Sequence, residues 1–121
     1  MDTHGTTTSV LLSGLAARTT TITGSSVDIG LYDGRVKIIQ DMHTMTGTPT
    51  LDGKIQDSPD GSSGWADVTG ATFVQVTAVA HEAIGLDTRK AKRYIRYVGT
   101  IGGGTPVLTG SVILVGARHI T

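Results

Sequence analysis

The chain has 121 residues, with ten Lys and Arg, ten Asp and Glu, and no cysteine. This length is sufficient for one domain with its own hydrophobic core. The balanced charge argues against a nucleic-acid-binding protein, because such proteins carry a basic excess that neutralises phosphates. The lack of cysteine excludes disulfides and thiolate metal sites. The apolar runs are too short to span a bilayer.

The N-terminal residues, 1–9, are rich in threonine and contain one strongly apolar side chain, Met1. Such a segment cannot bury enough apolar surface to order itself, so we predict a mobile arm over residues 1–9 and a single domain over residues 10–121. Threonine favours extended structure, so we expect the arm to order as a strand against a neighbouring subunit. No basic region precedes the first apolar run, so a secretory signal is not expected.

The remaining chain favours strands over helices, because it is rich in Gly, Thr and Val and contains a single Glu. Turn sequences rich in Gly, Pro, Asp and Ser separate the apolar segments. We therefore predict an all-β protein, an antiparallel β-sandwich or jelly-roll of about seven to eight short strands. The candidate strands are residues 20–23, 27–29, 35–42, 51–57, 65–68, 73–80, 92–101 and 109–115.

Alternation along these strands predicts some of the buried faces. In residues 73–80 one face is wholly apolar, and we expect it to face the core. Residues 92–101 carry apolar side chains on both faces, which leaves their inward face open and suggests a covered outer side. Residues 81–92 are predicted to form a single turn or an irregular loop, because Gly85 interrupts their helical character.

No residue pattern predicts a catalytic centre. The histidines are widely separated, and the segment HEAIG that begins at His81 has glycine where a zinc-protease helix needs its second histidine. The aspartates around residues 52–67 do not follow the ligand spacing of a calcium loop, and aspartate at a turn usually caps its own backbone. We therefore expect no enzyme, no metal and no cofactor.

The segment KIQDSPDGSSGWADV, residues 54–68, is typical of a β-hairpin whose second strand starts at Trp65. An exposed aromatic side chain on such a loop suits a sugar or a nucleobase. However, Trp65 is the only tryptophan in a chain with one phenylalanine, so it represents valuable core volume. We predict that Trp65 packs inward and that residues 58–63 form the exposed tip, with a ligand platform as the alternative.

The segment TRKAKRYIR, residues 88–96, is the one local concentration of positive charge. It suits a strip that binds nucleic acid, a charged loop whose side chains cover a sheet edge, or a docking site for an acidic partner. These interpretations remain open at this point. The residues that we predict to contact a partner are Thr3, His4, Thr6, Thr7 and Thr8 in the arm, and Arg89, Lys90 and Lys92 in the strip.

Three segments together resemble a family of small virion proteins of tailed bacteriophages that decorate or cement capsids. They are SSVDIGLYDGRVKIIQDM at residues 25–42, LDGKIQDSPDGSSGWADV at residues 51–68, and AKRYIRYVGTIGGGTPVLTGSVILVG at residues 91–116. The resemblance implies a β-sandwich or jelly-roll on the outer capsid surface, with no catalytic residues to transfer.

The function implied by this resemblance is that of a capsid decoration or cement protein, which stabilises the shell through repeated subunit contacts. Its partners would be the major capsid protein and sister subunits, in a homo-oligomer such as a trimer, with neither nucleic acid nor membrane. It would assemble in the bacterial host cytoplasm and reside in the virion. The alternatives are a carbohydrate-binding module or head spike that uses the Trp65 hairpin, and a head–tail joining or tail-tube subunit.

Overall fold

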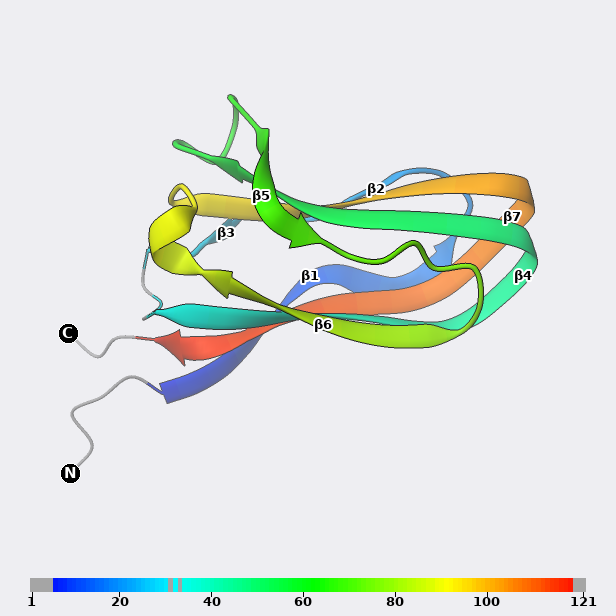
Figure 1. Ribbon diagram of the computed structural model, residues 1–121, viewed down its shortest axis with the longest axis horizontal. Helices are drawn as coiled ribbons and strands as arrows, with labels where there is room; N and C mark the ends of the chain where they lie inside the picture. Colours follow the sequence, from blue (N-terminus) through cyan, green and yellow to red (C-terminus); the bar gives the residue numbers. More distant parts are fainter. Residues whose placement is uncertain (1–5, 31, 33, 119–121) are drawn as a thin grey trace.

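Strands account for most of the chain in the computed structural model, which describes residues 6–30, 32 and 34–118 (Figure 1). A short 3-10 helix, η1 (Thr88–Lys90), interrupts them. The prediction of an all-β antiparallel fold is confirmed. The strands are β1 (Thr6–Arg18), β2 (Ile22–Thr23), β3 (Val27–Asp28), β4 (Arg35–Ser58), β5 (Ala66–Thr72), β6 (Ala80–Asp87) and β7 (Tyr94–Arg118).

The two longest strands, β4 and β7, form one antiparallel ribbon that bends back on itself (Figure 1). Their pairing runs from Lys37 opposite Val115 to Ser58 opposite Tyr94, with register shifts near the bend. Gly103 lies at the bend with φ of 95°, and a Cβ there would overlap the carbonyl oxygen of Thr48. The sequence predicts separate shorter strands in place of each of these long strands. In the sequence, a glycine-rich bend looks like a turn even when the strands stay hydrogen-bonded through it.

The folded ribbon produces two layers of strands (Figure 1). One layer has the order β1, the second half of β7, the first half of β4, and β6. The other has β2 and β3 beside the first half of β7, followed by the second half of β4 and β5. The arrangement agrees with the predicted antiparallel β-sandwich or jelly-roll.

The hydrophobic core lies between the two layers and draws on both halves of the ribbon. Ile38 and Leu114 from one layer and Ile55 and Ile95 from the other are fully buried. In β7, Ile95 and Tyr97 point inward while Arg96 between them is partly exposed. The inward face that the sequence left open is therefore the face of Ile95 and Tyr97.

The predicted strand at residues 73–80 is wrong in its extent and its inward face. Phe73 and Val76 are buried, but Val74 is 72% exposed and Val79 is 61% exposed. Phe73 donates its backbone N–H to Gly53, and Val76 exchanges backbone hydrogen bonds with Leu51. These two anchors are three residues apart, so the segment does not follow the two-residue period of a strand. β6 and η1 then replace the loop predicted for residues 81–92.

The predicted N-terminal arm differs from the structure over residues 6–9. These residues start β1 and pair with the end of β7, from Thr6 opposite Arg118 to Ser9 opposite Val115. β7 extends beyond the predicted strand 109–115, and its longer edge gives the threonines an intramolecular partner. The remainder of the arm, with Thr3 and His4, lies outside the described residues.

Candidate functional site

The loop between β4 and β5 is held by its own polar groups (Figure 1). The buried Ser58 Oγ accepts a hydrogen bond from Gly61 N at 3.0 Å and donates to the carbonyl oxygen of Ser63. The Asp60 carboxylate accepts from the backbone N–H groups of Ser62 and Ser63, both at 2.9 Å. These donors hold the pKa of Asp60 well below its usual range. The prediction that aspartate caps its own turn is confirmed at Asp60.

Trp65 does not pack in the core, which corrects the prediction from the sequence. The indole is partly exposed, and the Arg96 guanidinium lies 4.3 Å from its ring centroid. The aromatic volume of the interior is supplied by Tyr32, Phe73 and Tyr97, and the rings of Phe73 and Tyr97 meet edge to face at 6.1 Å. Because Arg96 alternates with the inward-facing Tyr97, its guanidinium covers the outer side of the sheet, where it meets Trp65.

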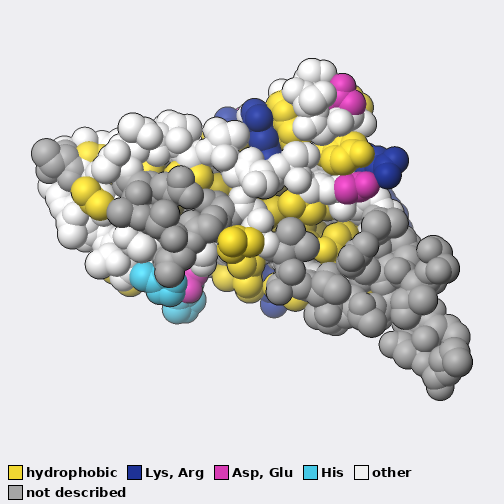
Figure 2. Space-filling model, turned by 180° about the vertical axis from the view of Figure 1, so that it is seen from behind, with side chains coloured by type: hydrophobic (Ala, Val, Ile, Leu, Met, Phe, Trp, Pro, Cys, Tyr) yellow, Lys and Arg dark blue, Asp and Glu magenta, His cyan; other side chains and the backbone are white. Residues whose placement is uncertain are grey.

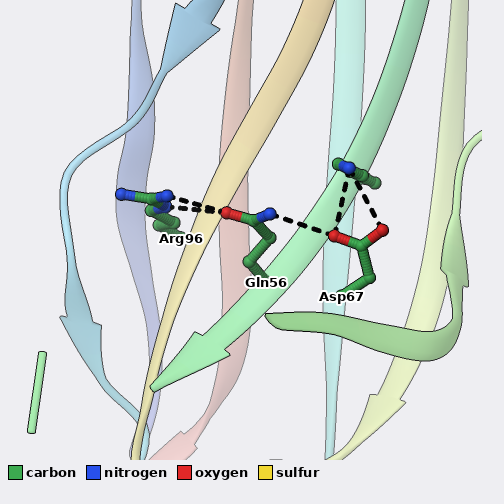
Figure 3. A network of polar contacts seen from close by, with 4 residues as sticks. Gln56, Asp67 and Arg96 are labelled. Carbon is green, nitrogen blue, oxygen red and sulfur yellow. Dashed lines mark hydrogen bonds and ion pairs between the residues drawn. The ribbon is translucent and has the colours of Figure 1, made fainter. Parts of the chain in front are cut away.

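Beside this stacked pair, a row of polar side chains crosses the outer face from β7 over β4 to β5 (Figure 3). The Arg96 guanidinium donates to Gln56 Oε1 at 2.8 and 3.0 Å. Gln56 Nε2 donates to Asp67 Oδ1 at 3.0 Å, and Lys54 Nζ lies 3.0 Å from the same oxygen. We call Lys54, Gln56, Trp65, Asp67 and Arg96 the outer ladder.

The outer ladder contains two cations, Lys54 and Arg96, and one carboxylate, Asp67, so it keeps one net positive charge. Hydrogen bonds from Gln56 and then Lys54 lower the pKa of Asp67 below its usual value. The ladder therefore presents a stacked Trp–Arg pair next to satisfied polar groups. Tryptophan and arginine are the side chains most enriched at energetically dominant positions of protein interfaces, so this arrangement suits a protein surface better than a reaction centre.

The basic strip is divided by the structure into paired and unpaired cations. Arg89 pairs with Asp87 at 3.1 Å, and Arg93 pairs with Asp28 at 2.9 Å. The Arg89 side chain lowers the pKa of Asp87 to about 2, and Arg93 lowers the pKa of Asp28. In both pairs the arginine is largely exposed and the aspartate is partly buried, so water screens the pairs and their contribution to stability is small.

Two lysines of the strip remain available for a partner. The side chains of Lys90 and Lys92 make no hydrogen bond or ion pair with the described residues, and both are exposed. The backbone N–H of Lys92 donates to Asp57 at 3.0 Å, which fixes the middle of the strip against β4. Of the predicted partner contacts Arg89, Lys90 and Lys92, only Arg89 is held in an ion pair; Lys90 contributes to the lowered pKa of Asp87 through its charge alone. Thr6, Thr7 and Thr8 lie instead in β1.

The two histidines that the structure describes lie on the face seen in Figure 2, next to a carboxylate. His43 Nε2 is 3.5 Å from one oxygen of Asp41, and His81 Nδ1 is 3.8 Å from the other. Both imidazoles are largely exposed. Among residues 6–30, 32 and 34–118, no group of three or more His, Cys, Asp or Glu is placed to hold a metal ion.

A hollow of about 340 Å³ opens beside β6 and was not predicted. Residues 74–82 line it, and the buried Gln40 forms its floor. Its exposed valines, Val74 and Val79, belong to the segment whose inward face was predicted incorrectly. Their exposure follows from backbone contacts made at Phe73 and Val76, which alternation along the sequence does not reveal.

Within the part of the chain that the structure covers, no helix has the length and hydropathy needed to cross a bilayer. The geometry defines the chain as an antiparallel all-β fold, consistent with a β-sandwich or jelly-roll. The outer ladder and the basic strip lie on its outer surface. No family model matches the sequence, and no curated protein matches it.

Solved structures show where the same fold occurs. The chain matches VP2 in a subviral particle of infectious bursal disease virus with a TM-score of 0.59 at 12% identity. The match covers 94% of this chain and 32% of that chain, so this protein spans about a third of the length of VP2. A structure of the Gt strain of the same virus matches this chain with a TM-score of 0.49 at 15% identity, over 93% of this chain and 33% of that chain.

Proposed function

We propose that this protein is a virion structural protein, a decoration or cement subunit that binds the outer surface of a capsid. The observation that carries the proposal is the fold, which nearly the whole chain shares with about a third of a viral protein that forms a subviral particle. The resemblance of three segments to decoration proteins of tailed bacteriophages supports the more specific role. The partners would be the major capsid protein and sister subunits.

The surface best suited to the capsid contact combines the outer ladder with Lys90 and Lys92. Trp65 and Arg96 offer a stacked pair that excludes water when a partner covers it. The two lysines are exposed and form no ion pair with the described residues, and capsid surfaces with acidic patches would attract their positive charge. A modest contact of this kind becomes strong when a symmetric shell repeats it many times.

Binding to shells tests the proposal. The purified protein is incubated with empty tailed-bacteriophage shells that lack their own decoration protein, and the shells are sedimented and imaged. We expect saturable binding on the outer surface. Charge reversal in the double variant Lys90→Glu, Lys92→Glu should weaken binding and leave the melting temperature unchanged.

The matched control is Lys37→Glu, a reversal at an exposed lysine of β4 outside the strip. It should bind like the unmodified protein. The loss in the double variant should shrink at high salt, because exposed charges are screened beyond about 8 Å at physiological ionic strength. Absence of binding to every shell tested would contradict the proposed function. Equal binding by the double variant would show that Lys90 and Lys92 are not part of the capsid contact.

A second candidate is a glycan-binding module or head spike, and the surface position of Trp65 favours it. Arg96 covers one side of the indole, and Asp60 and Asp67 are already engaged by neighbouring groups. A sugar would therefore stack on the remaining side of the ring. Quenching of tryptophan fluorescence by a glycan panel tests this directly, since Trp65 is the only tryptophan. An unchanged spectrum with every glycan would exclude it.

A further inference from the structure

The four edges of the two layers are protected to very different degrees. An exposed edge strand offers unpaired backbone groups to another chain, and proteins usually blunt such edges with short strands, bulges, lysine or proline. β2 and β3 contain two residues each. β1 has two register shifts, and its Leu12 carbonyl oxygen accepts a hydrogen bond from Ser25 N. β5 has one register shift against β4.

β6 lacks these four protections, and the one charge on its inward side, Glu82, is engaged by the backbone N–H of Val74. Its eight residues, AHEAIGLD, pair with β4 without a register shift, from Arg35 opposite Asp87 to Met42 opposite Ala80. Among the described strands β6 pairs with β4 alone, so its other edge carries no strand. The strand contains no lysine and no proline. It is the longest uninterrupted edge in the part of the fold that the structure describes.

From this edge we infer that a second copy of this chain pairs with β6 as an antiparallel strand around a two-fold axis at Ile84. Pairing of two identical edges joins the β6 layers of both copies into one continuous sheet. A self-complementary contact requires that no like charges lie opposite each other, and the sequence of β6 meets this requirement with the axis at Ile84.

With the axis at Ile84, His81 of one copy lies opposite Asp87 of the other, because both are three residues from the axis. The symmetry makes this contact twice, and it places an imidazole beside a carboxylate on the outer face. Ala83 lies opposite Gly85, and both are small and exposed. The Arg35 side chain of the same copy lies against Gly85 on the outer face. Glu82 lies opposite Leu86 and keeps its own partner, Val74 N at 3.0 Å. The His81 imidazole can donate a hydrogen bond to Asp87, whose oxygens also accept from Arg89, and polar pairs across antiparallel strands stabilise the register.

This contact goes beyond the proposed function and does not depend on it, because it is measured in the pure protein without any shell. Sedimentation equilibrium should show a concentration-dependent dimer. Ala83→Lys should weaken dimerisation at least tenfold, because the new ammonium group would lie opposite Gly85, beside which Arg35 of the second copy lies. The control Thr69→Lys changes an exposed position of β5 and should dimerise normally.

Cross-linking tests the register itself. The chain has no cysteine, so Ile84→Cys introduces a single thiol on the proposed axis. Mild oxidation should convert this variant to a disulfide-linked dimer, whereas Ala66→Cys on β5 should stay monomeric on a denaturing gel. Circular dichroism and melting curves confirm that each variant folds. A wild-type protein that stays monomeric at millimolar concentration would overturn the inference, as would a dimer that Ala83→Lys leaves intact and Ile84→Cys does not trap.

Discussion

Two polar networks link β4 to β7, one between the layers and one on the outer surface, and they obey different physical rules. Inside, Tyr97 donates its hydroxyl to Gln40 Oε1, and both residues are almost completely buried. Outside, Arg96 donates to Gln56, and Asp67 continues the row in partial contact with water. Tyr97 and Arg96 are sequence neighbours, so strand alternation alone assigns one to each network.

The comparison shows that burial, rather than the number of hydrogen bonds, sets how much each network contributes to stability. A buried polar group that loses its partner costs the full desolvation penalty, whereas an exposed one rebinds water. Burial also raises the pKa of Tyr97, so its hydroxyl keeps its proton. The interior has further adapted to the ring: a Cβ at Gly99 would lie 2.8 Å from the Tyr97 hydroxyl oxygen. The side chains of the outer ladder are not enclosed in this way, and they remain accessible to a partner.

The largest expected effect concerns the inner network. Tyr97→Ala removes a fully buried ring and leaves Gln40 without its hydroxyl partner, so it should destabilise the fold by about 3–5 kcal/mol. Urea unfolding measures this. Tyr94→Ala on the same strand is the control, because Tyr94 is only partly buried and should cost clearly less. Equal losses in the free energy of unfolding for both variants would show that the inner network does not stabilise the fold more than a partly buried tyrosine does.

The bend that separates the layers should be the next most sensitive feature. Gly103→Ala combines a φ of 95° with an overlap at the Thr48 carbonyl oxygen, and we expect a loss of about 1–3 kcal/mol. At Gly104 a Cβ would meet only the flexible Thr48 hydroxyl, at 2.8 Å. Gly104→Ala should therefore be milder in the same melting experiment. The reverse order of the two variants would contradict the described bend.

The outer ladder should contribute less to stability than either the inner network or the bend at Gly103. Trp65→Ala removes an exposed cation–π contact and should cost about 1 kcal/mol, well below the loss for a core tryptophan. Arg96→Ala should cost at least as much, since it removes the same contact together with two hydrogen bonds to Gln56. Thermal unfolding of both variants tests this. A loss at Trp65 as large as that of Tyr97→Ala would restore the core interpretation.

The smallest expected effect is a pH dependence of stability that arises from the Asp87–Arg89 pair. The folded pKa of Asp87 is lowered from 3.8 to about 2 by Arg89, so between these values the unfolded chain binds the extra proton. Stability from this group is therefore complete above pH 3.8 and is lost as the pH falls to about 2. Asp87→Asn should flatten this part of the pH profile. An identical profile for both proteins would exclude the contribution.

The fold class could be predicted from the sequence because turn residues recur between short β-branched segments. The continuous β4 and β7 could not, since their bends keep the ladder while containing Gly47 and Gly103. The outer ladder depends on register: Gln56 and Arg96 are far apart in the chain but lie opposite each other. Trp65 was misassigned because composition shows that aromatic volume is scarce, but not that Tyr97 and Phe73 already fill the interior.

The central claim is that the interior maintains the fold while the outer ladder, with Lys90 and Lys92, meets a capsid. The most direct measurement is a difference map, by electron cryo-microscopy, between shells with and without this protein. We predict density for the sandwich on the outer surface of the shell, with Trp65 and Arg96 at the contact. A map in which the ladder faces solvent and another side of the sandwich meets the shell would contradict the claim.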